Sequence, residues 1–276
     1  MHDTIILYCY HKCDELTVRH LDLLRRHNPK PVVIPVIGEP GVEELPGSVN
    51  VAHLPSRWCT DNLWRACDTL IYRWFQSRDL SARRYVYLEY DVLCTMPLET
   101  AYAEAWNAPV AARDFYTIRT APKWFRFNEQ SLSALGEDRK YAAALIPMAG
   151  TLYSHESLER IVDTVVNSNV FCELRMGTAV EKLGLKVAEF PNRLRSTFDW
   201  LPYSGACARP GLYHAVKADQ VSLVKRHVSR PRQLVTRLAE QLGVVSPIVR
   251  WQNLHKRARE MQAMAQEFRS QAAGGT

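Results

Sequence analysis

The sequence predicts an α/β fold built on a mostly parallel β-sheet. The chain opens with strand-like segments at residues 4–10 and 31–37, separated by a helical segment. This order is typical of two parallel strands with a helix across one face of the sheet. A later strand, residues 85–88, is followed directly by Glu89 and Asp91. Because ligands bind where parallel strands end, we expect a site at this edge of the sheet.

The opening elements have clear start and stop signals. Residues 4–10 are rich in β-branched and aromatic side chains, and Asp14 can then cap the start of a helix. Arg25-Arg26-His27 places basic residues in the last turn of this helix, and Asn28-Pro29 ends it. The run from 31 to 37, rich in Val and Ile, predicts the second strand.

A second helix is predicted from about Asp61 to Gln76, because apolar residues recur there at helical spacing. We expect its other face to be polar and to carry Asp61, Arg65, Asp68 and Tyr72. The strand Tyr85–Leu88 follows and ends in Glu89-Tyr90-Asp91.

The second half of the chain continues the alternation of strands and helices. Gly184 and Pro191 are the clearest stop signals in this half. In order, we expect a strand at 109–113, a loop around 124–127, an apolar run at 142–153, a helix at 156–166 capped by Ser154, a helix at 173–183, a strand at 186–190 and a loop at 193–213.

The net charge of +6 belongs to the end of the chain. Residues 1–216 hold 24 Lys and Arg against 25 Asp and Glu, whereas residues 217–276 hold 11 against 4. Nucleic acid is therefore an unlikely partner of the whole protein. We expect a nearly neutral domain over residues 1–217 and a basic, amphipathic helical extension over 218–276. Residues 225–269 could bind an anionic membrane surface, or pack on the domain or on a partner subunit.

The sequence predicts a cytoplasmic protein, with a membrane-peripheral location left open by the basic extension. No apolar run reaches the roughly 18 residues of a membrane span, and the first residues lack a signal-peptide pattern.

The seven cysteines are an odd number, which favours free thiols over a disulfide framework. Cys9, His11 and Cys13 contain zinc-ligand types but lack a second pair at zinc-site spacing.

Glu89 and Asp91 are the most informative pair of residues in the sequence. Carboxylates at positions i and i+2 of an extended chain point to the same side, where they can bind a hard divalent cation together. The alternative is that they are ordinary turn residues after a strand. The glycine-rich, nucleophile-elbow and HExxH motifs of dinucleotide-binding proteins, P-loop enzymes, α/β-hydrolases and zinc proteases are absent, which removes sequence support for those classes.

The order of elements and the Glu89-Tyr90-Asp91 motif resemble glycosyltransferases of the GT-A class. The resemblance covers about residues 4–217 and implies a Rossmann-like nucleotide-sugar-binding fold. In that class an Asp-x-Asp motif at this point holds the metal and the nucleotide diphosphate. The resemblance implies that Glu89 and Asp91 bind Mn²⁺ or Mg²⁺ and a nucleotide-diphospho-sugar donor. It also implies that the acceptor is a glycan or a lipid-linked molecule, as in bacterial-type polysaccharide or glycolipid synthesis.

The same resemblance assigns roles to other residues. It implies that Glu173 is the catalytic base of an inverting transfer and that His214 is a third metal ligand. Asp61, Arg65 and Asp68 would contact the nucleotide. The alternatives are a helix-start residue for Glu173, a hydrogen-bonded histidine for His214, and a solvated helix face for the other three.

Two aromatic segments, Trp124-Phe125 and Phe198-Asp199-Trp200, could offer flat surfaces to sugar rings or lie in the core. Asp199 is the better acceptor-site residue of the two segments.

Two other functions stay open. A sugar nucleotidyltransferase shares the fold but usually has a glycine-rich loop after the first strand, and Tyr10-His11-Lys12-Cys13-Asp14 contains no glycine. A non-catalytic glycan- or partner-binding protein could also keep this fold, and Glu89 in place of Asp leaves that open.

Overall fold

The computed structural model describes residues 1–54, 67–164, 170–195, 197–198 and 211–216. The expected basic extension, 218–276, lies outside them.

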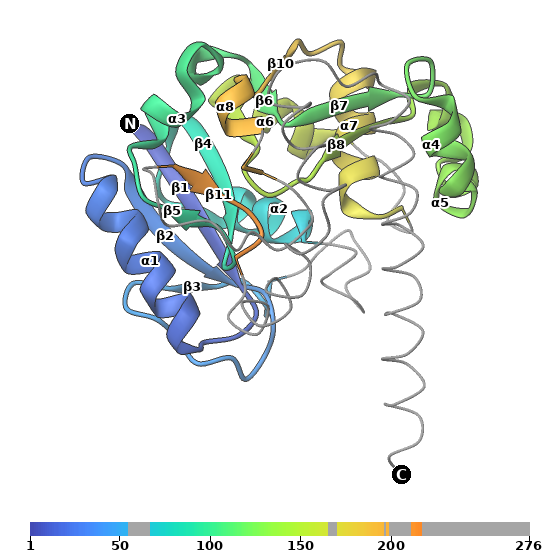
Figure 1. Ribbon diagram of the computed structural model, residues 1–276. Coiled ribbons are helices and arrows are strands. Elements are labelled where there is room, and N and C mark those ends of the chain that lie inside the picture. Colours follow the sequence, from blue (N-terminus) through green and yellow to red (C-terminus); the bar gives the residue numbers. More distant parts are fainter. Residues whose placement is uncertain (55–66, 165–169, 196, 199–210, 217–276) are drawn as a thin grey trace, which may run out of the picture. The chain divides into compact units, whose positions relative to one another are not determined.

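The described chain contains a seven-stranded sheet in the order β10-β6-β9-β4-β1-β2-β3 (Figure 1). Neighbouring strands pair in parallel except at β9, which is antiparallel to both β4 and β6. The predicted α/β fold with a mostly parallel central sheet is confirmed. The strands of this sheet are β1 (His2–Tyr10), β2 (Val32–Ile37), β3 (Val49–Asn50), β4 (Ala82–Glu89), β6 (Val110–Ala112), β9 (Leu152–Ser154) and β10 (Val187–Glu189).

Helices connect these strands, and α1 and α6 each begin at a capping side chain that the sequence predicts. Asp14 Oδ1 accepts a hydrogen bond from Thr17 N over 2.9 Å at the start of α1, and Ser154 Oγ accepts one from Ser157 N over 3.2 Å at the start of α6. The helices are α1 (Glu15–His27), α2 (Asp68–Ser77), α3 (Leu98–Tyr102), α4 (Pro122–Phe127), α5 (Glu129–Ala134), α6 (His155–Asp163), α7 (Cys172–Lys182) and α8 (Asn192–Arg195), with 3-10 turns at Ala103–Asn107 and Gly136–Tyr141.

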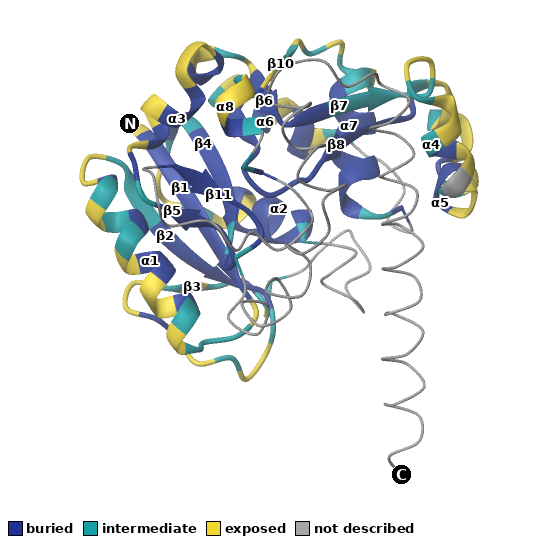
Figure 2. Ribbon diagram, viewed as in Figure 1, coloured by how far each residue is buried: buried dark blue, intermediate teal, exposed yellow. Residues whose placement is uncertain are grey.

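Both faces of the sheet are buried (Figure 2). Along β1, Ile5 and Leu7 join a core with residues of α2, α6 and α7, whereas Ile6 and Tyr8 join a second core with residues of α1 and α3. Alternate side chains of a strand point to opposite faces, so β1 supplies both cores. This explains why β1 reads as a continuous apolar run.

Two short antiparallel pairs extend this framework. β5 (Leu93–Cys94) pairs with β11 (Leu212–Tyr213), and β7 (Asp114–Thr117) pairs with β8 (Ala143–Ile146). No sequence pattern predicts either pairing. The β5–β11 pair matters most, because it joins the segment after β4 to a segment near residue 214.

Two local expectations are wrong. The loop expected around residues 124–127 is helix α4, which begins at Pro122, a residue well suited to the first turn of a helix. The stretch 193–213 was expected to be a loop, but its described part contains α8 and β11. The helix expected from Asp61 is described only from Asp68, because residues 55–66 lie outside the described chain.

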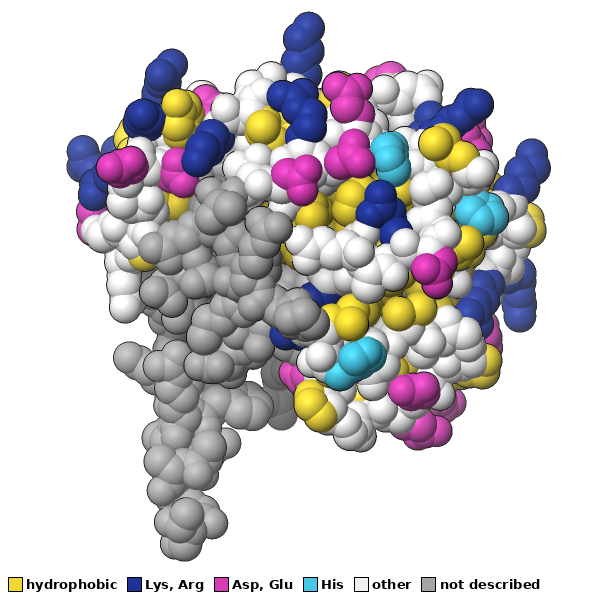
Figure 3. Space-filling model, turned by 180° about the vertical axis from the view of Figure 1, so that it is seen from behind, with side chains coloured by type: hydrophobic (Ala, Val, Ile, Leu, Met, Phe, Trp, Pro, Cys, Tyr) yellow, Lys and Arg dark blue, Asp and Glu magenta, His cyan; other side chains and the backbone are white. Residues whose placement is uncertain are grey.

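The surface of the described chain matches its balanced charge. On the face in Figure 3, Lys and Arg side chains lie among Asp and Glu rather than in a region of one sign. Among the described residues, no helix has the length and apolarity needed to cross a membrane.

Candidate active site

Asp91 and His214 are brought together by the short β5–β11 pair. Leu212 lies opposite Cys94 and Tyr213 opposite Leu93. Continuing this antiparallel register brings the residues before β5 alongside those after β11. The bond from Val216 N to Asp91 O, 2.8 Å, extends the pairing past His214. Two segments more than 100 positions apart in the chain therefore meet at one point.

A tight turn aims the two carboxylates. Val92 N donates to Glu89 O over 2.9 Å, and Tyr90 N donates to Cys9 O, also over 2.9 Å, which attaches the turn to the end of β1. The Tyr90 carbonyl oxygen is 3.0 Å from the Tyr8 hydroxyl and 3.0 Å from His20 Nδ1. Burial lowers the pKa of His20 and favours its neutral form. The turn thus rests on side chains of β1 and α1.

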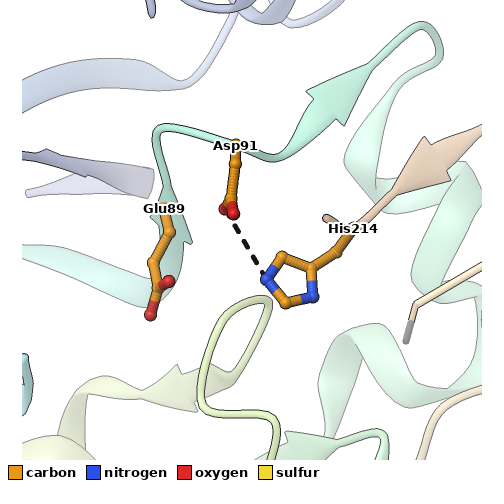
Figure 4. Close-up of side chains that lie close together, drawn as sticks. All are labelled: Glu89, Asp91 and His214. Carbon is orange, nitrogen blue, oxygen red and sulfur yellow. Dashed lines mark ion pairs between the residues drawn. The ribbon is translucent and has the colours of Figure 1, made fainter. Parts of the chain in front are cut away.

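Glu89, Asp91 and His214, the ligand cluster, converge at the carboxyl end of β4 (Figure 4). One possible ligand atom from each lies within 4.8 Å of the others. Asp91 Oδ1 is 3.6 Å from His214 Nε2. Asp91 and His214 are buried, whereas Glu89 is half-buried. The structure therefore brings together the three residues that the sequence suggested as metal ligands.

The ligand cluster fits a divalent cation. An ion with bonds of about 2.0–2.1 Å holds its ligand atoms about 3–4 Å apart, and the Asp91–His214 spacing falls within this range. At 3.6 Å the same spacing is too long for a hydrogen bond. Two carboxylates with an imidazole suit Mn²⁺ well, whereas Mg²⁺ favours oxygen ligands alone.

The ring of Phe198 stacks on the imidazole ring of His214. Their ring centroids are 5.2 Å apart, with planes inclined by 21°, and His214 N donates to Thr197 O over 3.1 Å. Gly150, at φ +83°, leaves room for this ring: a Cβ atom there would lie 2.6 Å from Phe198 Cε1. Phe198 is fully buried. Of the two alternatives for Phe198, a sugar-binding surface or the core, the structure shows the core, and the neighbours Asp199 and Trp200 lie outside the described residues.

In the other aromatic segment, Phe125 is buried in the core, the second of the two alternatives for this residue. Trp124 is half-buried and makes ring contacts with Tyr116, Phe125 and Phe171.

Glu173 lies in the first turn of α7 and is not a member of the ligand cluster. Its carboxylate accepts a hydrogen bond from Cys172 Sγ over 3.2 Å. Only 8% of the residue is exposed, and this burial raises its pKa to about 7. The carboxyl therefore changes its protonation state near neutral pH.

A chain of side chains connects Glu173 to the ligand cluster. Cys172 Sγ is 3.3 Å from Cys67 Sγ, Cys67 lies beside Tyr87, and the Tyr87 hydroxyl donates to Glu89 Oε1 over 3.2 Å. The five described cysteines are free thiols, as expected.

Asp68 lies in the interior, not on a polar helix face. Arg175 donates to it from two guanidinium nitrogens, with Nε 2.7 Å from Asp68 Oδ2, and neither side chain is exposed. A third bond runs from Arg175 Nη1 to Val170 O over 2.8 Å. Tyr72 is buried as well. The polar face expected for this helix is wrong at both residues, and Asp61 and Arg65 lie outside the described chain.

Several charged residues near the carboxyl edge of the sheet were not singled out from the sequence. The Lys12 ammonium lies 5.2 Å from the ring centre of Tyr90, and His11 meets the same ring edge-on. After β6, Asp114 is buried between Arg113 and Arg195. A polar residue directly after a predicted parallel strand was the available signal in both places.

A scan against models of protein families finds no match, and a search of curated proteins finds none. Among solved structures the chain is similar to LgtC, described as a galactosyltransferase: two LgtC structures, each 11% identical, have TM-scores of 0.39 and 0.38 and cover 69% of this chain and 74% of LgtC. WbbM, a bifunctional glycosyltransferase, is also 11% identical, with a TM-score of 0.36, covering 70% of this chain and 39% of WbbM.

Proposed function

We propose that the chain transfers a sugar from a nucleotide-diphosphate donor to an acceptor hydroxyl, with a divalent cation held by Glu89, Asp91 and His214. The observation that carries this proposal is the convergence of these three side chains where β4 ends. The edge where parallel strands end is where α/β proteins bind nucleotides. Glu89 is partly exposed, so its carboxylate can be reached by a ligand from solvent.

The proposed reaction needs charge neutralisation at the leaving group. A bound Mn²⁺ or Mg²⁺ supplies positive charge to the two phosphates of the departing nucleoside diphosphate. Asp91 and His214 are both buried. The ring of Phe198 stacks on His214, and the β5–β11 pair joins the two segments that carry Asp91 and His214, so both side chains hold fixed positions. Lys12, beside Tyr90, lies close to this turn, where its ammonium is paired with the Asp14 carboxylate at 2.6 Å.

We propose Glu173 as the group that accepts the proton from the acceptor hydroxyl. The acceptor oxygen forms a bond to the anomeric carbon, and the bond from that carbon to the diphosphate oxygen breaks, which inverts the anomeric centre. A carboxyl with a pKa of about 7 is well matched to a base that works near neutral pH. A Glu173→Gln variant that keeps full activity would end this assignment.

The experiment that tests the function is a donor screen. Purified protein is incubated with Mn²⁺ and UDP- or GDP-linked sugars, and release of nucleoside diphosphate is followed with and without mixed acceptor alcohols. We expect release with at least one donor and its loss in Asp91→Asn. Asp79→Asn, which changes an exposed carboxylate outside the cluster, is the matched control.

The same assay separates the competing functions. A sugar nucleotidyltransferase would release pyrophosphate from a nucleoside triphosphate and a sugar phosphate. A non-catalytic binding protein would be stabilised against heat by a nucleotide sugar without converting it. Either result would replace the proposed transfer.

We also propose that the acceptor is a glycan or a lipid-linked molecule and that basic residues within 225–269 bring the chain to an anionic membrane surface. The charge excess of residues 217–276 supports this. Sedimentation with vesicles of anionic lipid tests it. Equal sedimentation of the full chain and of a chain lacking residues 225–276 would contradict it.

A further inference from the structure

Two thiols far apart in sequence meet beside Glu173. Cys67 precedes α2 and Cys172 is the first residue of α7, and their sulfur atoms are 3.3 Å apart. Cys172 also donates to the Glu173 carboxylate, and Cys67 lies beside Tyr87. The thiol pair is thus the middle of the chain of contacts that connects Glu89 with Glu173.

We propose that Cys67 and Cys172 form a redox-modification site, in which a peroxide converts the two thiols into one disulfide. A disulfide needs a sulfur–sulfur bond of about 2.05 Å, so the sulfurs must approach by only slightly more than 1 Å. The backbones that carry them are the starts of two helices, where a small shift breaks few helical hydrogen bonds.

The reaction balances in two steps. Cys67, which is partly exposed, reacts first: its sulfur takes one oxygen from hydrogen peroxide, giving a sulfenic acid and one water. The buried Cys172 sulfur then attacks the Cys67 sulfur, the S–O bond breaks, and a second water leaves. The two sulfurs lose two electrons, which the peroxide takes up, and a dithiol reductant reverses the change.

The disulfide would act on Glu173 through a lost hydrogen bond. Cys172 donates to the Glu173 carboxylate only while it carries its proton. Once oxidised, it is no longer a donor, and the buried carboxylate loses a contact that favours its charged form. If Glu173 is the proposed base, oxidation lowers transfer activity; this consequence alone rests on the proposed function.

The groups around Cys67 also determine the rate at which peroxide oxidises its thiol. Its bond with Cys172 lowers the thiol pKa, but burial and the nearby Glu89, Glu173 and Asp68 outweigh it and raise the pKa to about 11. The thiolate is the reactive form. We therefore expect oxidation to speed up about tenfold for each pH unit between 7 and 10.

Peptide mapping tests the site directly. Folded protein is treated with hydrogen peroxide, free thiols are alkylated, and the chain is digested with trypsin. Cleavage at Arg65, Arg73, Arg160 and Arg175 gives peptides 66–73 and 161–175, each with one cysteine, and separates Cys59 from Cys67. We expect these two peptides to be linked and to separate on reduction.

Matched variants decide the outcome. Cys67→Ser and Cys172→Ser should each abolish the linked peptides, and Cys94→Ser should leave them unchanged. Cys94 is a suitable control because it is also buried, with a pKa raised to about 11 by that burial. Failure to link the two peptides in the folded wild type, or links from Cys67 mainly to Cys9 or Cys59, would overturn the proposal. Because this readout needs no sugar donor, it is independent of the proposed transfer.

Discussion

Two charged regions of the molecule are built in opposite ways. At the starts of α2 and α7, the carboxylate of Asp68 faces the guanidinium of Arg175, and neither is exposed. At the carboxyl end of β4, two carboxylates and an imidazole face a common point, and Glu89 is partly exposed. The first region, the helix-start cluster, also contains Cys67, Cys172 and Glu173.

The contrast separates a structural role from a ligand-binding role. The Asp68–Arg175 pair satisfies its own charge and hydrogen bonds inside the core, so it needs no ligand. The ligand cluster gathers negative groups, whose mutual repulsion a cation would relieve. Removing one member of the Asp68–Arg175 pair should therefore destabilise the fold. Removing one member of the ligand cluster should instead change ligand binding.

The largest expected effect is from Arg175→Met. It leaves Asp68 buried without its guanidinium, which should lower the free energy of unfolding by about 3–5 kcal/mol. Urea unfolding followed by circular dichroism measures this. The double variant Asp68→Leu with Arg175→Met should recover most of the loss, because neither charge of the pair remains buried without its partner. A double variant as unstable as the single one would contradict this account of the pair.

The next effect is the pH dependence that Glu173 causes. Its carboxyl has a pKa near 4.5 in the unfolded chain and about 7 in the folded one, so between these values the folded protein binds the extra proton. The unfolding free energy should then fall as pH rises from 4.5 to 7, by about 3 kcal/mol relative to Glu173→Gln. Unfolding curves at several pH values measure it, and parallel pH profiles for the two proteins would contradict the shift.

A smaller effect is expected from Gly150→Ala. The new Cβ would meet Phe198 in a backbone conformation with φ +83°, so we expect a loss of about 1–3 kcal/mol and weaker binding of Mn²⁺ through His214. Gly184→Ala is the control, since φ there is +62° but no atom lies within 4 Å of the Cβ position. Equal losses of stability and of Mn²⁺ affinity in both variants would contradict the claim that Gly150, through Phe198, positions His214.

The smallest effect on stability should come from Glu89→Gln. The residue is half-buried and its carboxylate lies near that of Asp91, so in metal-free buffer we expect a change of less than about 1 kcal/mol. Thermal unfolding with and without Mn²⁺ measures it. The stabilisation by Mn²⁺ should shrink, and a large loss of stability without metal would place Glu89 with the structural residues instead.

The sequence predicted those parts of the fold that local rules determine. The strands β1, β2 and β4, the cap at Asp14 and the stop after His27 follow from hydrophobic runs and helix-end chemistry, and the structure confirms them. Helix α4 was missed because the aromatic and charged residues of 124–127 show no clear apolar face, although Pro122 was a start signal.

Side-chain burial was harder to predict than element order. Asp68 looked like a surface residue because its partner, Arg175, is more than 100 positions away, and no local pattern reports such a pair. His214 was suggested only by resemblance, since its position depends on a two-residue pairing of β5 with β11. The Cys67–Cys172 contact is likewise invisible in the sequence because it depends on how α2 and α7 pack.

Direct titration with Mn²⁺ tests the central claim, that the ligand cluster is a metal centre. Electron paramagnetic resonance of free Mn²⁺ would be measured for the wild type, Asp91→Asn, His214→Ala and the control Asp79→Asn. We expect one Mn²⁺ per chain, with affinity at least about tenfold lower in the first two variants and unchanged in the third. Failure of the wild type to bind Mn²⁺ with or without a nucleoside diphosphate, or equal affinity in all four proteins, would contradict the claim.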